Sequence, residues 1–245
     1  MTIEEHKIEW SKPVAINFKA NGDIEFDATE SCWDDYYGFF VISIDTIETD
    51  QLLCIGKSYD NKIRDCVIKK YREIHGPKIL PKDKKYKAQA GIIVSNHNKP
   101  DSSEESKRFF HDIYSLLNFD NRKLLHLNAH KSTKNYDGRN LEITNENCGL
   151  IKEKSSSPSV IAYKLFKVFK VKKIRKGGLL EYPDIMDFFG KKLKEYDKEH
   201  INNAIDYLEE NGFVEKIKNS KYGKNGFDLK LLVRRNKSFD DDEYI

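Results

Sequence analysis

The sequence predicts an α+β protein with two domains. Its first half has the pattern strand, strand, helix, strand, helix, and its second half has three helical patterns followed by two strand patterns. Between them, residues 152–158 combine three serines and a proline with charged residues, as linkers do. We therefore expect an N-terminal domain over residues 1–150, a C-terminal domain over residues 158–236 and an acidic tail at 237–245.

The N-terminal elements follow from their apolar patterns. Residues 38–44 are apolar and β-prone, and residues 51–55 return after a polar turn, so the pair is expected to form a hairpin. Residues 60–75 are expected to form a helix that begins at Asp60 and ends before Gly76-Pro77. A third strand at 88–95 and a second helix from 101 complete the order. The core sides of the two helices are Ile63, Val67, Ile68 and Tyr71, and Phe109, Phe110, Ile113, Leu116 and Leu117.

Composition excludes several classes of protein. With 38% hydrophobic and 34% charged residues over 245 positions, the chain is expected to be globular with a sizeable core. No apolar run approaches the roughly 18–20 residues of a membrane span. The first residues are polar and acidic, which is not the pattern of a secretory signal. The four cysteines form no C-x-x-C pair, which favours reduced thiols and a cytoplasmic location.

Charge is distributed unevenly along the chain. Residues 1–50 contain 3 lysines and 12 acidic residues, a net charge of −9. Residues 57–87 contain 11 basic and 4 acidic residues, and residues 151–236 contain 20 basic and 12 acidic residues, net charges of +7 and +8. Two basic blocks indicate a polyanionic partner, although a solvated lysine-rich surface has the same composition.

The motif Leu53-Cys54-Ile55-Gly56-Lys57-Ser58 ends the predicted hairpin, and Arg64 follows on the next helix. Together with Gly38-Phe39-Phe40 on the first strand, this constellation resembles the GIY-YIG nucleases over roughly residues 36–128. In that family a Gly-Ile-Tyr strand lies beside a Tyr-Ile-Gly strand. An Arg on the first helix and a Glu on a later helix complete a phosphodiesterase site, so the resemblance implies metal-dependent hydrolysis.

The resemblance assigns roles residue by residue. Phe40 and Cys54 stand at the two tyrosine positions and lack the phenol, so in an active enzyme Tyr36, Tyr37 or His111 would be the substitute base. Gly56, Lys57 and Ser58 match, and Arg64 would compensate charge on the phosphate. Asp112, or its rival Glu105, would hold Mg²⁺ or Mn²⁺, and Asn128 matches a trailing asparagine. Each of these residues could also have a purely structural role. Arg64 would then be a solvated helix residue, Lys57 would end a strand, and Asp112 would be a surface acid.

The C-terminal domain resembles a winged helix. Helices are expected at 160–172, from Pro183 to 193 and at 198–210, the last with Ile201, Ala204, Ile205 and Leu208 on one face and Asn211-Gly212 at its end. Strands at 213–217 and 227–233 flank a loop rich in Lys, Asn and Gly.

That resemblance implies DNA contacts. Lys198, His200, Asn202 and Asn203 near the start of the third helix would reach bases, and Lys218, Lys221 and Lys224 of the loop would follow phosphates. Lys69 and Lys70 on the first predicted helix would add phosphate contacts. Against this, Asp206, Glu209 and Glu210 make the end of the third helix acidic, and many winged helices bind proteins instead.

The sequence therefore predicts a metal-dependent DNA endonuclease of the restriction or phage-defence kind, in which the winged helix selects the site. The alternative is a catalytically silent regulator or adaptor that binds DNA, which the missing tyrosines motivate. RNA is a further alternative partner, since phosphate contacts do not select the sugar. The acidic residues 1–50 would suit a basic protein partner or the chain's own basic surface.

Overall fold

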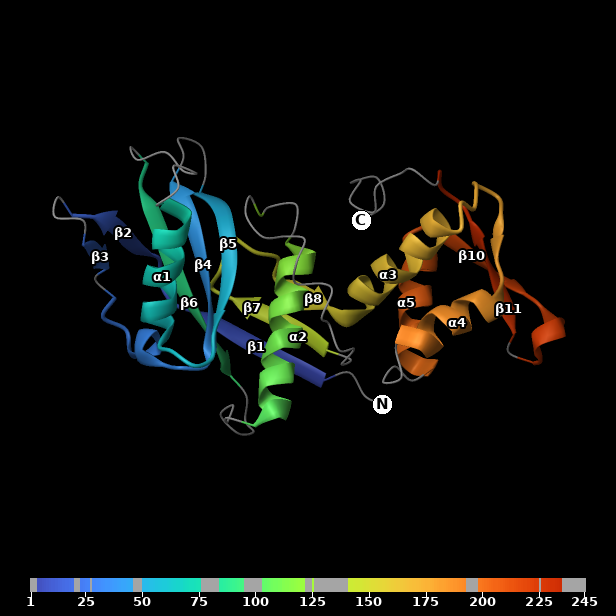
Figure 1. Ribbon diagram of the computed structural model, residues 1–245, viewed down its shortest axis with the longest axis horizontal. Coiled ribbons are helices and arrows are strands. Elements are labelled where there is room, and N and C mark those ends of the chain that lie inside the picture. The colour runs from blue at the N-terminus through green and yellow to red at the C-terminus, as the bar shows by residue number, and fades with distance from the viewer. Residues whose placement is uncertain are drawn as a thin grey trace. The chain divides into compact units, whose positions relative to one another are not determined.

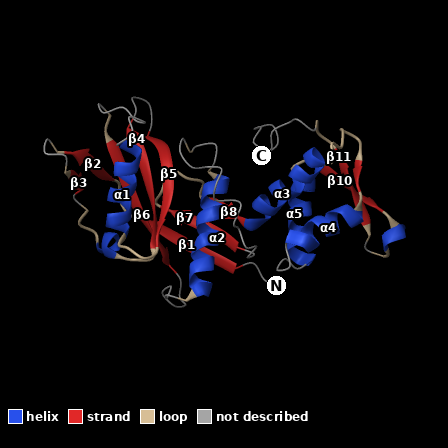
Figure 2. Ribbon diagram, in the orientation of Figure 1, coloured by secondary structure: helices blue, strands red, loops and turns tan. Residues whose placement is uncertain are grey.

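The computed structural model describes residues 4–19, 23–26, 28–45, 50–75, 84–94, 103–121, 125, 141–192, 198–224 and 226–234. The chain forms two compact units, the first from residues 3–136 and 141–155, the second from residues 156–245 together with 1–2 and 137–140. Each unit combines helices and a sheet, so the predicted α+β class is confirmed (Figure 1, Figure 2).

Strand β6 is the centre of the mixed sheet in the first unit. One of its edges pairs antiparallel with β4, which pairs in turn with β5. Its other edge pairs with β2 and β1 placed end to end, and β1 also pairs in parallel with β7, beside which β8 lies. The strands are β1 (Glu4–Trp10), β2 (Val14–Phe18), β3 (Ile24–Phe26), β4 (Gly38–Asp45), β5 (Asp50–Ser58), β6 (Tyr86–Val94), β7 (Leu141–Glu146) and β8 (Lys154–Ser156).

Strands β1, β2 and β3 are part of this sheet, so the described part of the predicted acidic extension contributes strands to the first unit. In β1, Ile8 and Trp10 are buried whereas Glu9 is exposed, the alternation of a strand with one covered face. The short 3-10 helix η1 (Ser31–Asp34) buries Trp33 completely. The strand residues Glu5, Glu9 and Glu25 are exposed, so these acidic residues lie on strands that also contribute to the core.

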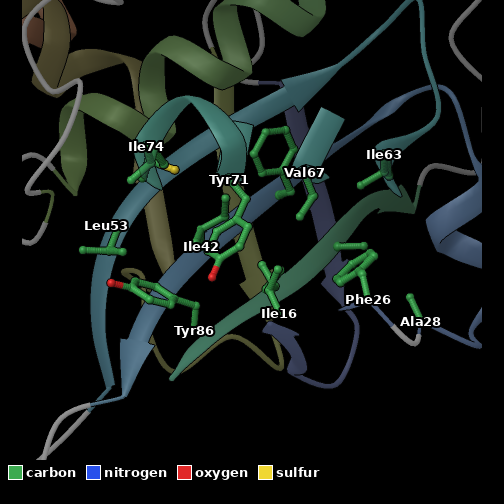
Figure 3. Close-up of a cluster of buried hydrophobic side chains, with 14 of the residues drawn as sticks. Ile16, Phe26, Ala28, Ile42, Leu53, Ile63, Val67, Tyr71, Ile74 and Tyr86 are labelled. Atoms are coloured by element: carbon green, nitrogen blue, oxygen red, sulfur yellow. The ribbon is translucent and has the colours of Figure 1, made fainter. Parts of the chain in front are cut away.

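Helix α1 (Ile63–His75) packs its predicted apolar face on β4 and β5. Ile63, Val67, Tyr71 and Ile74 lie along one side of the helix and belong to the same buried cluster as Ile42 and Tyr86 (Figure 3). The rings of Tyr71 and Tyr86 meet with centroids 5.4 Å apart. The helix begins at Ile63 rather than at Asp60, and the N–H of Ile63 donates to the carbonyl of Asp35, 2.9 Å away. Residues of the chain ahead of β4 thus help to fix the start of α1.

Helix α2 (Glu104–Asp120) covers the opposite face of β4. Its N-terminus is capped by Ser103, whose hydroxyl accepts from the N–H of Ser106. The ring of Phe110 stacks on Phe39 with centroids 5.0 Å apart, while the neighbouring Phe40 joins the α1 core. Since successive side chains of a strand point to opposite faces, β4 lies between the two helices.

The second unit has three helices and a three-stranded antiparallel sheet in the order β10-β11-β9. Leu165 and Phe169 of α3 pack with Ile205 and Leu208 of α5 among its fully buried residues. Strand β9 is not in the sequence prediction, because two residues are too short for a periodic signal. The elements are α3 (Ser157–Val171), β9 (Leu179–Leu180), α4 (Tyr182–Lys192), α5 (Lys198–Glu210), β10 (Val214–Lys218), η3 (Ser220–Tyr222) and β11 (Phe227–Leu231).

No helix among the described residues is long and apolar enough to cross a membrane.

Gly56 is required by the packing of Phe40, the residue opposite it in the β4–β5 pair. A Cβ on Gly56 would overlap Cζ of the buried Phe40 ring, so Gly56→Ala is expected to lower the free energy of unfolding by about 1–3 kcal/mol. Urea unfolding followed by circular dichroism measures this. Gly149→Ala is the matched control, because its Cβ would meet nothing within 4 Å. Equal midpoints for the two variants would show that the Phe40 ring moves aside freely.

Candidate functional site

Phe40 and Cys54, the residues at the two tyrosine positions of the resemblance, belong to the core between β4, β5 and α1. Phe40 is 3% exposed, and Cys54 is fully buried. Burial raises the pKa of the Cys54 thiol to about 12, so it stays protonated at neutral pH. Neither side chain reaches solvent or carries a group able to activate water. Both side chains are therefore part of the hydrophobic core and not of an exposed surface.

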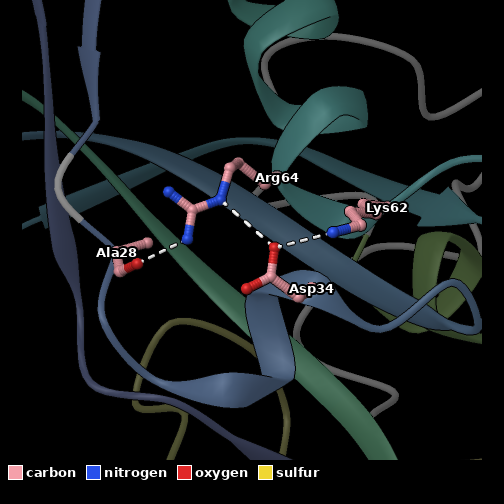
Figure 4. A network of polar contacts seen from close by, with 4 residues as sticks. All are labelled: Ala28, Asp34, Lys62 and Arg64. Atoms are coloured by element: carbon pink, nitrogen blue, oxygen red, sulfur yellow. Dashed lines mark hydrogen bonds and ion pairs between the residues drawn. The ribbon is translucent and has the colours of Figure 1, made fainter.

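Arg64 joins the first turn of α1 to the segment that precedes β4. Its Nη2 donates to the carbonyl of Ala28 at 2.6 Å, and its Nε lies 3.7 Å from Oδ1 of Asp34 (Figure 4). Lys62 shares that carboxylate, with Nζ 3.4 Å from the same oxygen. Two of the five N–H groups of the guanidinium are thus directed at groups of the chain itself. This contact set gives Arg64 a role in holding η1 against α1.

Lys57 and Tyr37 lie on the other side of the sheet, toward α2. Lys57 is directly opposite Phe39 in the β4–β5 register, and its Nζ lies 5.5 Å from the centre of the Tyr114 ring. The Tyr37 ring meets Tyr59 edge-on at 5.1 Å. Burial lowers the pKa of the Lys57 ammonium, and the charge of Asp60 opposes this shift. The structure therefore brings Lys57 and Tyr37 to one face and leaves Phe40, Cys54 and Arg64 on the other.

The two metal-ligand candidates lie on α2. Asp112 is fully buried, whereas Glu105 is exposed in the first turn. Among the described residues, no three His, Cys, Asp or Glu side chains form a group able to hold a metal ion. Asn128, the trailing asparagine of the motif, lies outside the described residues. The described side chains therefore do not bring Asp112 or Glu105 together with two further ligands.

The acidic charge of the first 50 residues is partly matched within the first unit. Asp45 and Asp50 both lie close to Lys87, at 3.4 Å and 3.1 Å from its Nζ. Glu9 pairs with Lys7 at 3.4 Å. On α1, Lys69 is exposed, and Lys70 pairs with Glu73 at 3.2 Å. Much of the sequence asymmetry is thus local charge pairing between neighbouring elements.

A buried carboxylate holds the basic β10–β11 loop (residues 219–226) in the second unit. Asp228 is 5% exposed; its Oδ1 accepts from the N–H of Tyr182 at 3.1 Å and its Oδ2 from Nδ2 of Asn219 at 2.7 Å. The Tyr222 ring stacks on Tyr182 with centroids 5.9 Å apart. The loop is therefore fixed against the start of α4. Nothing in the local sequence pattern marks Asp228 out, since its partners lie 9 and 46 residues away.

The loop presents its lysines to solvent. Lys218 at the end of β10 and Lys221 and Lys224 in the loop are exposed. On α5, Asn202 is exposed and Asn203 partly so, whereas the side chains of Lys198 and His200 lie outside the described part. The three lysines and Asn202 thus form the accessible part of the predicted interface.

Lys216 of β10 takes up much of the acidic charge at the end of α5. Its Nζ contacts Asp206 and lies 3.7 Å from Oε2 of Glu209, and its backbone N–H donates to Oε1 of Glu209 at 2.9 Å. Glu210 is exposed. The acidic end of α5 therefore repels a polyanion less than the sequence alone implies.

Replacing Arg64 by alanine is expected to lower the free energy of unfolding by about 1–3 kcal/mol, because it removes a charge-assisted bond to the half-buried carbonyl of Ala28. Lys62→Ala is the control, since it shares Asp34 but loses an exposed ion pair of about 0.5 kcal/mol. Guanidinium unfolding of both variants measures the difference. Similar small losses for both would contradict the clamping role of Arg64.

Searches against protein-family models, curated proteins and solved structures found no match to this chain. Its function is therefore inferred from the positions and charges of its own side chains.

Proposed function

We propose that this chain binds DNA through its C-terminal unit, which we interpret as a winged helix with the β10–β11 loop as its wing. The element order helix, strand, two helices, strand, loop, strand and the sheet order β10-β11-β9 support this reading. The observation that carries it is the rigid attachment of a lysine-bearing loop through the buried Asp228. A loop fixed in this way is ordered before it meets its ligand, so binding costs less conformational entropy.

The contacts divide into two kinds. Lys218, Lys221 and Lys224 meet phosphates, which gives affinity that falls with salt. Asn202, exposed on α5, is suited to the paired donor and acceptor of adenine in the major groove. This division resembles winged helices that place the third helix in the major groove and the wing along the backbone.

For the first unit we propose a GIY-YIG-like arrangement without the family's chemistry. The order β4, β5, α1, β6, α2 is the expected one. At the positions of the resemblance, however, Phe40 and Cys54 are core residues and Arg64 is occupied by Ala28 and Asp34. The first unit would therefore act as a scaffold or adaptor surface. This corresponds to the alternative of a catalytically silent regulator or adaptor that binds DNA.

A metal-dependent endonuclease is the second candidate, and Lys57 is the observation that favours it. Its amine is half-buried with a lowered pKa, so more of it is neutral near pH 7 than in an exposed lysine. A neutral lysine can accept a proton from an attacking water. Tyr37 and Tyr59 lie on the same side of the sheet and would orient the substrate.

The triple change Lys218→Ala/Lys221→Ala/Lys224→Ala is expected to weaken DNA binding and to flatten the slope of log K against log salt by up to about 2.7, since each lost phosphate contact removes about 0.9. Fluorescence anisotropy with a labelled duplex at several salt concentrations measures both. The matched control removes three exposed lysines of the first unit, Lys12, Lys19 and Lys152. An equal loss of DNA affinity in both triple variants would indicate general electrostatic attraction and would contradict the proposed interface.

Supercoiled plasmid incubated with Mg²⁺ or Mn²⁺ is expected to show no nicking above a chelator control, because the positions of the family's tyrosines are buried. Agarose electrophoresis provides the readout. Metal-dependent nicking that Lys57→Met abolishes, and that the exposed Lys12→Met leaves intact, would establish the endonuclease and overturn the silent form of the proposal. Repeating the assay on single-stranded RNA shows whether the chain cleaves RNA as well as DNA.

A further inference from the structure

A basic turn follows α3 in the second unit. Its charged residues are all exposed, and they are Lys170, Lys172, Lys173, Arg175 and Lys176. Lys172 pairs with Asp184, but no carboxylate among the described residues makes an ion pair with Arg175 or Lys176. This group, which we call the basic turn (residues 170–176), therefore holds cations that the described part of the unit does not neutralise.

Apolar side chains are exposed beside these charges. Val171, at the end of α3, is 80% exposed, and Leu179 on β9 is 47% exposed. Both are branched aliphatic residues of the kind that proteins usually cover. A ligand that carried both carboxylates and apolar groups would match this surface better than a simple polyanion.

The chain itself leaves β11 next to the basic turn. The N–H of Gly177 donates to the carbonyl of Leu231 at 2.7 Å, and the N–H of Leu231 donates to the carbonyl of Gly178 at 3.0 Å. Beyond β11 the N–H of Leu232 donates to the carbonyl of Phe213 at 3.0 Å and Val233 is buried, so the described chain is held as far as Arg234. From Arg234 the sequence continues six residues to Asp240, a reach of up to about 20 Å. There it reads Phe239-Asp240-Asp241-Asp242-Glu243-Tyr244-Ile245, four carboxylates between apolar residues, in a part of the chain outside the described residues.

We propose that the basic turn is the docking surface for this acidic segment (residues 239–245) of the same chain. The four carboxylates would face Arg175 and Lys176. The flanking Phe239, Tyr244 and Ile245 would cover Val171 and Leu179. Because the segment is tethered a few residues away, its effective concentration is about millimolar, so a weak and salt-sensitive contact is sufficient to hold it.

The wing is the other basic surface of this unit, but it lies at the wrong end of β11. The register pairs Lys218 with Phe227, the first residue of the strand, whereas the segment departs after Leu231, the last. The two ends are separated by four residues, about 13 Å along the strand. Proximity therefore favours the basic turn over the wing as the site of the acidic segment.

The consequence for DNA depends on the proposed function of the unit. A docked acidic segment places four negative charges on the unit proposed to bind DNA, where they oppose the approach of phosphates to the wing. The acidic segment would then reduce affinity for weak, non-specific DNA more than for a well-contacted site. Releasing or neutralising it is expected to tighten binding.

Zero-length carbodiimide crosslinking of the full chain tests the docking without DNA. At low salt, peptide mass spectrometry is expected to find isopeptide bonds from Lys173 or Lys176 to residues 240–243, and these are expected to be lost in about 1 M salt. Arg175→Glu/Lys176→Glu is expected to abolish them, whereas Lys221→Glu/Lys224→Glu on the wing leaves them. Absence of the crosslinks, or their survival in Arg175→Glu/Lys176→Glu, would overturn the proposal.

DNA binding gives the second readout. The variant Asp240→Asn/Asp241→Asn/Asp242→Asn/Glu243→Gln is expected to bind duplex DNA about tenfold more tightly at low salt. The control changes four exposed acids of the first unit, Glu5, Glu25, Glu30 and Glu153, to glutamine, which alters net charge equally and is expected to change affinity less than about twofold. Equal tightening in both variants contradicts this effect of the acidic segment. Crosslinks in a chain that binds no DNA would support the docking and refute the proposed function alone.

Discussion

Burial of β4 on both faces is the constraint on which the first unit depends. Every residue from Gly38 to Ile44 is buried, so the strand must pair on both edges and be covered by a helix on each side. Alternation then sends Phe39 toward α2 and Phe40 toward α1. Chemistry that needs solvent is thereby confined to the ends of the hairpin, where Lys57 and Tyr37 lie.

In the second unit the corresponding constraint is the buried carboxylate of Asp228. Asp228 is a nearly buried carboxylate, and such a group is tolerated when hydrogen bonds replace its hydration. One of its oxygens fixes the first turn of α4, and the other fixes the β10–β11 loop. Because the same side chain bonds to both elements, the loop is held in place by its attachment to α4. The apolar packing of α3 against α5 could not position a polar loop in this way.

Local periodicity predicted the elements that have strong patterns. The face formed by Ile63, Val67 and Tyr71 predicted α1, and the apolar run from residue 38 predicted β4, since both signals lie within one element. Strands β1 to β3 were not predicted. In β1 only Ile8 and Trp10 are apolar, among charged residues, and β2 and β3 have only five and three residues, too few for a clear periodic signal. Strand β9 has only two residues and gains its place by pairing with β11.

The candidate site was less predictable than the fold for two reasons. Which face a strand residue occupies depends on the hairpin register, and a shift of one residue reverses every side chain. The register that pairs Phe40 with Gly56 contains an irregularity after Ile42 that no local pattern reveals. The role of Arg64 depends on a carbonyl 36 residues away, which becomes its partner only after the sheet has formed.

The parallel pairing of β1 with β7 affects how the chain can fold as it is synthesised. Glu4 of β1 is opposite Leu141 of β7, so one edge of the first strand has no partner until roughly 130 more residues have been made. At ordinary rates of translation this takes about 7–26 s. Throughout that interval Ile8 and Trp10 belong to a sheet that is incomplete. The second unit, whose described elements are contiguous from Ser157 to Leu231, has no such wait, so the part of the protein made last is the part able to fold fastest.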